Sequence, residues 1–275
     1  MGEIIACANQ KGGVGKTTTV VSLASYLALD GQRVLVVDLD PQGNATSGVG
    51  LDRQLIDRSV YDALVGGTGI TELIQPTPVD RFSIIPSSRD LAGVEVELVP
   101  LAGRERRLAT VLSPVAERFD YVLLDCPPSL GLLTINALTA ADSVLVPIQC
   151  EYYALEGLGQ LMSTIDLVRE HLNTQLRLKG VVLTMFDGRT TLSADVSAEV
   201  RRHLGDRVFD SVIPRSVRLA EAPSYGRPIP LYSPASRGAQ AYSDLAAEIL
   251  RRDGRQTLPG NPAVPAGGRP WVTVS

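Results

Sequence analysis

The sequence predicts an α/β protein with a doubly wound, mostly parallel sheet flanked by helices. Short apolar runs rich in Val, Ile and Leu alternate along the chain with helical patterns, and this alternation is typical of β-α-β units with right-handed crossovers. The apolar runs are continuous rather than alternating with polar residues, which favours parallel strands covered on both faces. With 275 residues, 44% of them hydrophobic and 20% charged, the chain can bury a sizeable core.

The individual elements follow in order along the chain. A first strand is expected over residues 3–9, then a glycine-rich turn and a helix over residues 16–29, which Gly31 is placed to end. The segment Arg-Val-Leu-Val-Val-Asp predicts a second strand over residues 33–38. Further strands are expected at 82–86, 121–125, 143–148, 180–185 and 208–213, and the clearest later helices at 104–118, 155–172, 192–204 and 239–252.

The last residues differ in composition from the rest of the chain. Pro, Gly and small residues dominate residues 254–275 without any periodicity, and the single tryptophan, Trp271, lies there. We therefore expect one domain over residues 1–253 and a disordered tail over residues 254–275.

Composition also excludes several classes of protein. No run of about 18 apolar residues occurs, so no transmembrane helix is expected. Residues 1–10 lack the basic and apolar segments of a secretory signal. The three cysteines, Cys7, Cys126 and Cys150, fit neither a disulfide framework nor a zinc site. We expect buried, inert thiols in a cytoplasmic protein.

Charge is distributed unevenly along the chain. The formal net charge of −4 argues, taken alone, against a nucleic-acid partner. Residues 1–176, however, hold 12 basic and 21 acidic side chains (net −9), whereas residues 177–255 hold 13 and 9 (net +4), with Arg269 beyond them. Only three of the 26 basic residues are lysines, and two of these, Lys11 and Lys16, lie in one short segment.

That segment is a glycine-rich loop between the first strand and the first helix. It approximates the Walker A spacing with the residues Lys11, Gly12, Gly13, Val14, Gly15, Lys16, Thr17 and Thr18. Glycines let successive backbone N–H groups curve around phosphate oxygens, and the helix N-terminus adds partial positive charge. Lys16 can reach the β- and γ-phosphates, and the Thr17 hydroxyl can bind Mg²⁺. The alternative, a glycine-rich turn with a chance lysine, does not explain the strand–loop–helix context. The sequence therefore predicts a fold of the P-loop NTPase type.

Two further strand ends carry carboxylates. Asp38 and Asp40 end the second strand, and Asp125 ends the strand at 121–125. Ligands of open parallel sheets bind outside the carboxyl ends of the strands. Asp125 is thus a candidate Walker B acid for Mg²⁺, and Asp38 and Asp40 could orient Mg²⁺-bound or attacking water. Helix caps and loop anchors are the alternative roles for these acids.

An additional lysine at the start of the loop is unusual. A lysine held near phosphate stabilises charge in the transition state as an arginine finger does, in cis or in trans. Lys11 is therefore a candidate catalytic residue, and a solvated surface lysine is the alternative.

With this lysine, the loop resembles the deviant Walker A motif, and residues 1 to about 252 resemble the ParA/Soj chromosome-partitioning ATPases. Supporting segments lie at 38–50, 125–140, 149–157 and 213–224. The resemblance implies Mg-ATP at Gly12–Thr18, an ATP-dependent sandwich homodimer, Lys11 reaching the partner's phosphates, and Asp40 positioning the attacking water. Adenine in this family rests near the segment that is Pro214 to Ser216 here.

The resemblance also implies partners. ATP-bound dimers of this family bind double-stranded DNA without sequence preference, through basic residues corresponding to Arg189 and Arg218. A ParB-like, centromere-bound protein would stimulate hydrolysis and release the dimer from DNA, so a nucleoid-associated location in the cytoplasm is expected. The residues themselves add Arg215, which follows a strand close to the expected nucleotide. Without interleaved aromatic residues, phosphate contact alone is expected. Solvated helix-face arginines are the alternative.

Two other functions remain open at this point. A MinD-like membrane-cycling regulator would end in a basic amphipathic helix, but residues 255–275 contain four prolines and no apolar stripe. An iron–sulfur carrier of the nitrogenase iron-protein type would use two cysteines of each subunit, and neither Cys126 nor Cys150 lies in a convincing ligand pattern.

Overall fold

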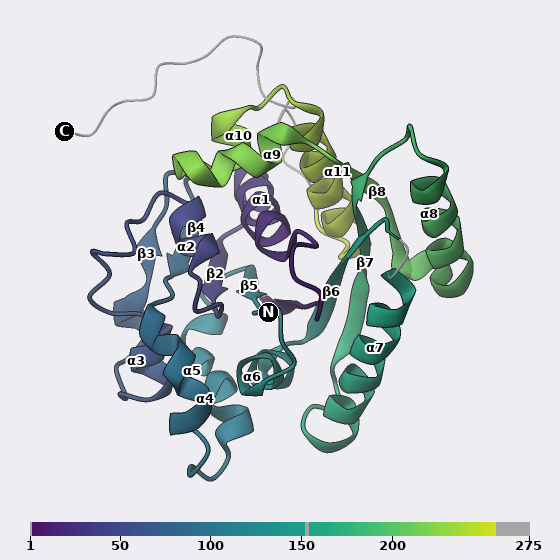
Figure 1. Ribbon diagram of the computed structural model, residues 1–275. Helices are drawn as coiled ribbons and strands as arrows, with labels where there is room; N and C mark the ends of the chain where they lie inside the picture. Colours follow the sequence, from purple (N-terminus) through teal and green to yellow (C-terminus); the bar gives the residue numbers. More distant parts are fainter. Residues whose placement is uncertain (1, 152–153, 257–275) are drawn as a thin grey trace, which may run out of the picture.

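A computed structural model describes residues 2–151 and 154–256. Its centre is one eight-stranded sheet in the order β3-β4-β2-β5-β1-β6-β7-β8 (Figure 1). All neighbouring pairs are parallel except β3 with β4. The strands are β1 (Glu3–Cys7), β2 (Val34–Asp38), β3 (Gln75–Pro76), β4 (Phe82–Ile85), β5 (Tyr121–Asp125), β6 (Ser143–Gln149), β7 (Arg177–Phe186) and β8 (Val208–Pro214). The predicted doubly wound, mostly parallel sheet is confirmed.

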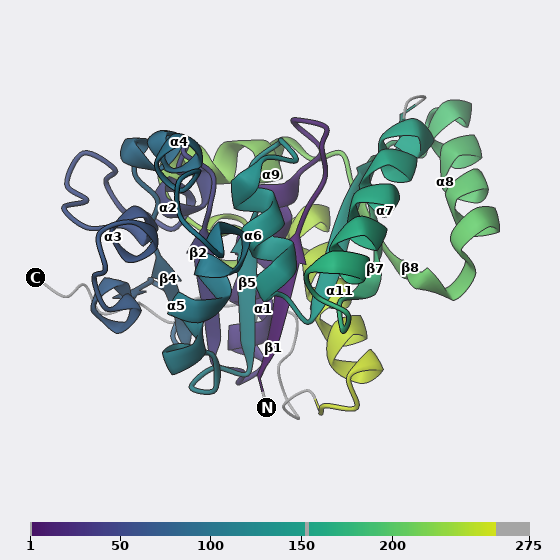
Figure 2. The ribbon, with the colours of Figure 1, turned by 90° about the horizontal axis from the view of Figure 1, so that it is seen from below.

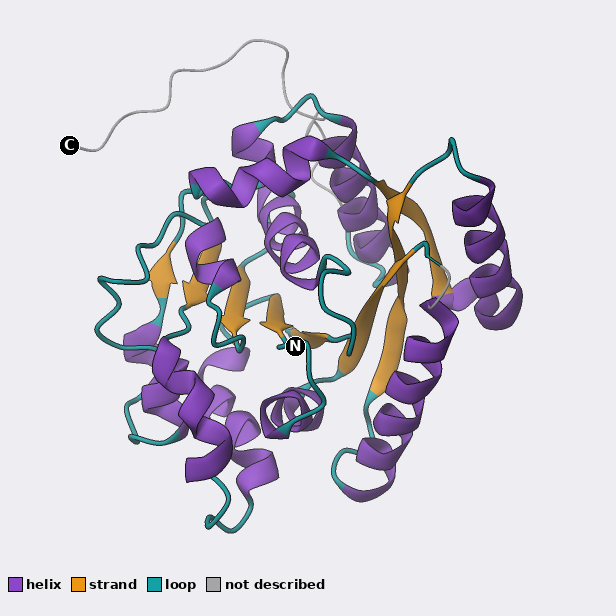
Figure 3. Ribbon diagram, viewed as in Figure 1, coloured by secondary structure: helices purple, strands orange, loops and turns teal. Residues whose placement is uncertain are grey.

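Helices cover both faces of this sheet (Figure 3). They are α1 (Lys16–Leu29), α2 (Asn44–Gly48), α3 (Val60–Leu64), α4 (Val94–Glu97), α5 (Arg107–Ala116), α6 (Leu132–Ala140), α7 (Ala154–His171), α8 (Thr191–Leu204), α9 (Val217–Glu221), α10 (Ile229–Tyr232) and α11 (Arg237–Arg252). Five 3₁₀ turns join them in the described part of the chain: Ile70–Leu73, Arg89–Gly93, Arg104–Arg106, Gly205–Arg207 and Ala222–Tyr225.

Two apolar cores result, one on each side of the sheet. One core joins the sheet to α3, α5, α6, α7 and α8, and Figure 2 shows α5, α6 and α7 in front of the strands. The other joins it to α1, α9, α10 and α11. Strands buried on both faces, such as β2 and β5, have no exposed residue, which is why their sequences read as continuous apolar runs.

All seven predicted strands are present, with shifted ends. β1 ends at Cys7 because the side chain of Asn9 holds a turn: its amide donates to the Pro147 carbonyl at 2.7 Å and its oxygen accepts from the Lys11 backbone at 2.9 Å. The helix predicted over 104–118 is divided into a 3₁₀ turn and α5. Asn136 causes this division, since it bonds the Arg104 carbonyl and the Leu108 amide.

The strand predicted from 180 begins three residues earlier, at Arg177. Its register with β6 passes from Leu178 to Gly180, leaving Lys179 in a bulge. Gly180 has φ +157°, and a Cβ there would lie 2.6 Å from the Phe209 ring. Lys179 forms ion pairs with Glu3 and Asp253, which ties the start of β1 to the end of α11. The tail predicted over 254–275 lies almost entirely outside the described residues, so that prediction stays open.

Candidate nucleotide-binding site

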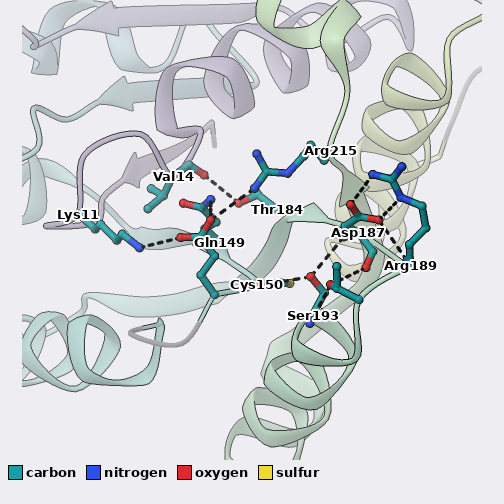
Figure 4. Close-up of polar contacts among 11 residues, drawn as sticks. Lys11, Val14, Gln149, Cys150, Thr184, Asp187, Arg189, Ser193 and Arg215 are labelled. Atoms are coloured by element: carbon teal, nitrogen blue, oxygen red, sulfur yellow. Dashed lines mark hydrogen bonds and ion pairs between the residues drawn. The ribbon is translucent and has the colours of Figure 1, made fainter.

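The glycine-rich loop leaves β1 and enters α1 at the carboxyl edge of the sheet. Gly13 and Gly15 adopt φ +74° and +89°, the left-handed region that favours glycine. The Thr184 hydroxyl on β7 donates to the Val14 carbonyl at 2.8 Å and anchors the loop, as Figure 4 shows. α1 has no side-chain cap and no acidic residue in its first turn. Its N-terminus therefore keeps free N–H groups and positive character, which suit an anion.

Lys16 begins this helix and lies inside the site. Its side chain is buried, and its ammonium group donates to the Lys11 carbonyl at 3.2 Å. The contact draws the start of the loop over the lysine, so that the charge lies within the curve of the loop. Thr17 and Thr18 follow in the first turn and line the same cavity as Lys16.

Asp38 and Asp125 lie side by side under the loop. β2 and β5 pair them directly, and both are fully buried. The Asp38 carboxylate accepts from the Thr46 hydroxyl at 2.7 Å, the Thr46 amide at 2.8 Å and the Asp40 amide at 3.2 Å. Burial raises the pKa of Asp38 to about 6, partly offset by the Thr46 hydrogen bonds. Asp38 thus holds the loop after β2 in place.

Asp125 is in a different situation. Among the described residues, none donates a hydrogen bond of good geometry to either carboxylate oxygen of Asp125. Burial, and then the negative charge of Asp38, raise the pKa of Asp125 well above its usual range, while the neighbouring Thr17 hydroxyl and Lys16 ammonium act in the opposite direction. A buried carboxylate without partners is costly. The arrangement fits a cation held between Asp125 and Thr17, with Asp38 beside it.

Asp40 lies two residues beyond the end of β2, at the wall of the cavity. One of its carboxylate oxygens accepts from the Gln42 amide at 2.9 Å, and its backbone carbonyl accepts from the Ser87 hydroxyl at 2.7 Å. The first bond orients the carboxylate, and the second fixes the backbone that carries it. It lies on the same cavity wall as Gln42 and Asn44.

The cavity that these elements enclose has a volume of about 500 Å³. One end is polar and is lined by the glycine loop with Lys16, Thr17 and Asp40. The other end is mainly apolar and is lined by residues from β7 and from the segment after β8: Met185, Leu219, Ala220, Ala222, Pro223, Arg227, Pro228 and Ile229. A polar end and an apolar end suit a nucleotide with its phosphates on the loop and its base on the apolar wall.

Comparisons with known proteins bear on this geometry. A family model described as "AAA domain" matches residues 2–178. The sporulation initiation inhibitor protein Soj of Bacillus subtilis is 57% identical over 249 residues, covering 90% of this chain and 98% of Soj. The chromosome partitioning protein ParA of Myxococcus xanthus is 52% identical, covering 92% of this chain and 89% of ParA.

The chain belongs to the ParA/Soj family of chromosome-partitioning ATPases. The fold also resembles that of a solved structure. A solved structure described as cobyrinic acid a,c-diamide synthase from Mycobacterium smegmatis with bound ATP analog and magnesium has a TM-score of 0.81 and 40% identity, and covers 94% of this chain and 98% of its own.

In this ParA/Soj-family chain, the Lys11 side chain is not part of the cavity lining. Its side chain lies at the mouth of the loop, and its ammonium group pairs with Glu151 at 3.4 Å. Figure 4 shows Lys11 directed toward the end of β6. The sequence reasoning missed Glu151 as a partner, because nothing in the local sequence links residues 140 positions apart.

The two residues expected near adenine lie close to the cavity but are not part of its lining. Pro214 ends β8, and Ser216 directly precedes α9. The lining residues begin three positions later, at Leu219. Pro214 and Ser216 remain a prediction, and the apolar wall from Leu219 to Ile229 is the part that sequence reasoning missed. Most of the residues that line this wall are ordinary apolar ones, so no chemical signal marks them.

The three arginines predicted to bind DNA each pair with a carboxylate. Arg189 pairs with Asp187 at 2.7 Å in the loop after β7, Arg218 with Glu221 at 3.0 Å on α9, and Arg215 with Glu151 at 3.4 Å. All three side chains are more than half exposed. Pairs of this kind contribute little to stability, so the guanidinium groups can exchange partners.

The cysteines and helices also bear on the alternative functions. Cys7, Cys126 and Cys150 are all buried and free of disulfides, and burial raises the pKa of the Cys150 thiol to about 11. A cluster shared between two subunits needs accessible thiolates, so this burial argues against the iron–sulfur alternative.

Within the described residues, no helix combines the length and apolar character that a membrane span requires.

Proposed function

We propose that this chain is a Mg-ATP-dependent ATPase that dimerises on ATP, binds DNA without sequence preference, and partitions a chromosome or plasmid with a ParB-like partner. The observation that carries the proposal is the two-ended cavity at the carboxyl edge of the sheet, with an uncapped helix N-terminus and Lys16 at its polar end. Membership of the ParA/Soj family supports it.

Nucleotide binding follows from the loop. The N–H groups of Gly12, Gly13 and Gly15 and the first turn of α1 provide donors for phosphate oxygens. Lys16 would exchange its bond to the Lys11 carbonyl for the β- and γ-phosphates. The base would lie against the apolar wall around Leu219 and Ile229. Val14 and Thr18 complete the loop, and Pro214 and Ser216 lie beyond this wall.

Magnesium fits the orphaned carboxylate of Asp125. Thr17 and Asp125 would hold the ion, and Asp38 would hold the loop of Asp40 and add negative charge beside it. When bound, Mg²⁺ supplies charge neutralisation on the phosphate oxygens. The buried, like-charged pair of carboxylates is then balanced by a cation.

Hydrolysis needs a positioned water and a compensated transition state. Asp40, whose side chain the Gln42 amide orients, would accept a hydrogen bond from the attacking water and align it. Lys11 starts at the mouth of the loop, and in a dimer it would reach the phosphates of the partner subunit.

DNA binding would use the net-positive part of the chain. Residues 177–255 carry a net charge of +4, and Arg189, Arg215 and Arg218 lie there with exposed side chains. Contacts to phosphates alone give sequence-independent, salt-sensitive binding. Such a protein would be found on the nucleoid, and its release would depend on a ParB-like stimulator of hydrolysis. We propose that residues 1–253 act as one domain in this cycle.

A DNA mobility shift with and without ATP, at two salt concentrations, tests the proposal. We expect a shift only with ATP, equal for unrelated sequences, and much weaker at the higher salt. A parallel phosphate-release assay with the cognate ParB-like protein and DNA should show stimulated hydrolysis. A shift that is independent of ATP, or restricted to one sequence, would contradict the proposal.

A further inference from the structure

One carboxylate beside the site has no role in the function proposed above. Glu151 lies two residues after the end of β6, and it is bound by three groups from three parts of the chain. Its Oε2 pairs with the Lys11 ammonium at 3.4 Å. Its Oε1 accepts from the Gln149 side-chain amide and from the Arg215 guanidinium, the latter at 3.4 Å.

The fold brings these groups together. β1, β6, β7 and β8 are consecutive in the sheet, so the loops that leave their carboxyl ends are neighbours. The Cys150 amide donates to the Thr184 carbonyl at 3.2 Å, and the Glu151 amide to the Gln149 carbonyl at 2.8 Å. This tight turn directs the Glu151 carboxylate back toward the glycine loop. Figure 4 shows Lys11 and Arg215 approaching the Gln149 side chain from different elements.

We propose that Glu151 is a latch that holds Lys11 within its own subunit in the nucleotide-free protein, and that Arg215 loosens the latch by competing for the same carboxylate. The inference rests on the proposed role of Lys11 at the phosphates of a partner subunit. The pair with Glu151 holds the Lys11 ammonium group beside the end of β6 of its own subunit, so it opposes movement of that group toward a phosphate across a dimer. Glu151 is thus a positioning residue, which acts through Lys11.

The competition follows from elementary electrostatics. One carboxylate carries a single negative charge, and two cations share it. Arg215 attracts Glu151 and repels Lys11, so its presence weakens the hold on Lys11. Removal of Glu151 frees Lys11, whereas removal of Arg215 leaves Lys11 as the only cation paired with Glu151 in the described part of the chain. The two substitutions therefore act in opposite directions, which a purely structural role of this corner would not produce.

The first experiment uses the nucleotide-free protein. Because the chain has three lysines, acetylation of Lys11 by an amine-reactive reagent can be followed by mass spectrometry, with Lys179 as the internal reference. A half-exposed ion pair predicts that Glu151→Gln speeds acetylation of Lys11 about two- to fivefold, and that Arg215→Ala slows it. Raising the salt concentration should reduce both differences. An unchanged Lys11 rate in Glu151→Gln overturns the latch, and an unchanged or faster rate in Arg215→Ala overturns the competition.

The second experiment measures ATP-dependent dimerisation by light scattering. We expect Glu151→Gln to dimerise at an ATP concentration about two- to fivefold lower than the unsubstituted protein, and Arg215→Ala at a higher one. The exposed pair Arg58–Glu72, with a separation of 3.0 Å, provides matched controls: Arg58→Ala and Glu72→Gln should leave the midpoint unchanged. If the unsubstituted protein fails to dimerise, the proposed function is wrong, while the acetylation result still decides the latch. Equal midpoints for all the dimerising proteins overturn the latch.

Discussion

Asp38 on β2 and Asp125 on β5 stand opposite one another in the register of the sheet, and both carboxyl groups are fully buried. Three donors bind Asp38, whereas Asp125 has no hydrogen-bond partner of good geometry among the described residues. Burial raises the pKa of both groups. In the absence of a cation, this pair therefore stores an electrostatic penalty at the place where the proposed function needs positive charge.

The penalty predicts a pH dependence of stability. A carboxyl whose pKa is higher in the folded than in the unfolded state binds its proton more tightly when folded, so the stability falls as pH rises. For Asp38, the pKa near 6 places this fall between about pH 4 and pH 6, and it corresponds to about 3 kcal/mol. Asp125 shifts in the same direction and adds to the fall.

Asp125→Asn should remove part of that dependence. We compare the free energy of unfolding of the variant with that of the unsubstituted protein, without nucleotide and Mg²⁺. We expect the difference, variant minus unsubstituted protein, to be about 1–3 kcal/mol more positive at pH 7 than at pH 4. Urea denaturation at both pH values measures this. The same variant should lose Mg²⁺-dependent nucleotide binding. Parallel stability curves for the two proteins would show that Asp125 is not penalised by burial.

Lys16→Ala should abolish ATP binding. The substitution removes the one ammonium group that lies within the curve of the loop, among the described residues. Calorimetric titration with Mg-ATP measures the loss, and thermal unfolding followed by circular dichroism checks that the variant is folded. Arg58→Ala, which removes an exposed charge far along the chain from the loop, serves as the control. Retained ATP affinity in Lys16→Ala would place the phosphate site elsewhere.

Asp40→Ala should trap an ATP-bound dimer. The groups that bind phosphate remain, while the carboxylate that would align water is lost, so hydrolysis should slow about a hundredfold or more. Size-exclusion chromatography with light scattering should show a dimer that persists with ATP. A variant that stays monomeric with ATP, or that hydrolyses ATP at the normal rate, would exclude this role for Asp40.

Arg218→Glu should weaken binding to every DNA sequence equally and should lower the salt dependence of binding. The side chain is exposed and its guanidinium group pairs with Glu221 on the same helix, so its loss should leave ATP affinity unchanged. Mobility shifts with two unrelated duplexes at several salt concentrations measure both effects. A loss confined to one duplex would indicate base contacts instead.

Much of the fold could be predicted because its signals are local. β2 and β5 are continuous apolar runs that end in Asp38 and Asp125, and a strand buried on both faces requires such a run. The glycine loop is equally explicit, since Gly13 and Gly15 have conformations that other residues rarely adopt. By contrast, β3 has two residues, and helices such as α2 and α9 have five, which is too short for periodicity to be read.

The sequence by itself determined the chemistry of the polar half of the site: which residues carry charge, and that they follow strands whose carboxyl ends share one edge of the sheet. Only the tertiary structure decided what faces them. It placed the apolar wall from Leu219 to Ile229 over the loop, left Asp125 without hydrogen-bond partners of good geometry among the described residues, and paired Lys11 with Glu151. Contacts between residues more than a hundred positions apart depend on strand order, and strand order is a property of the folded sheet.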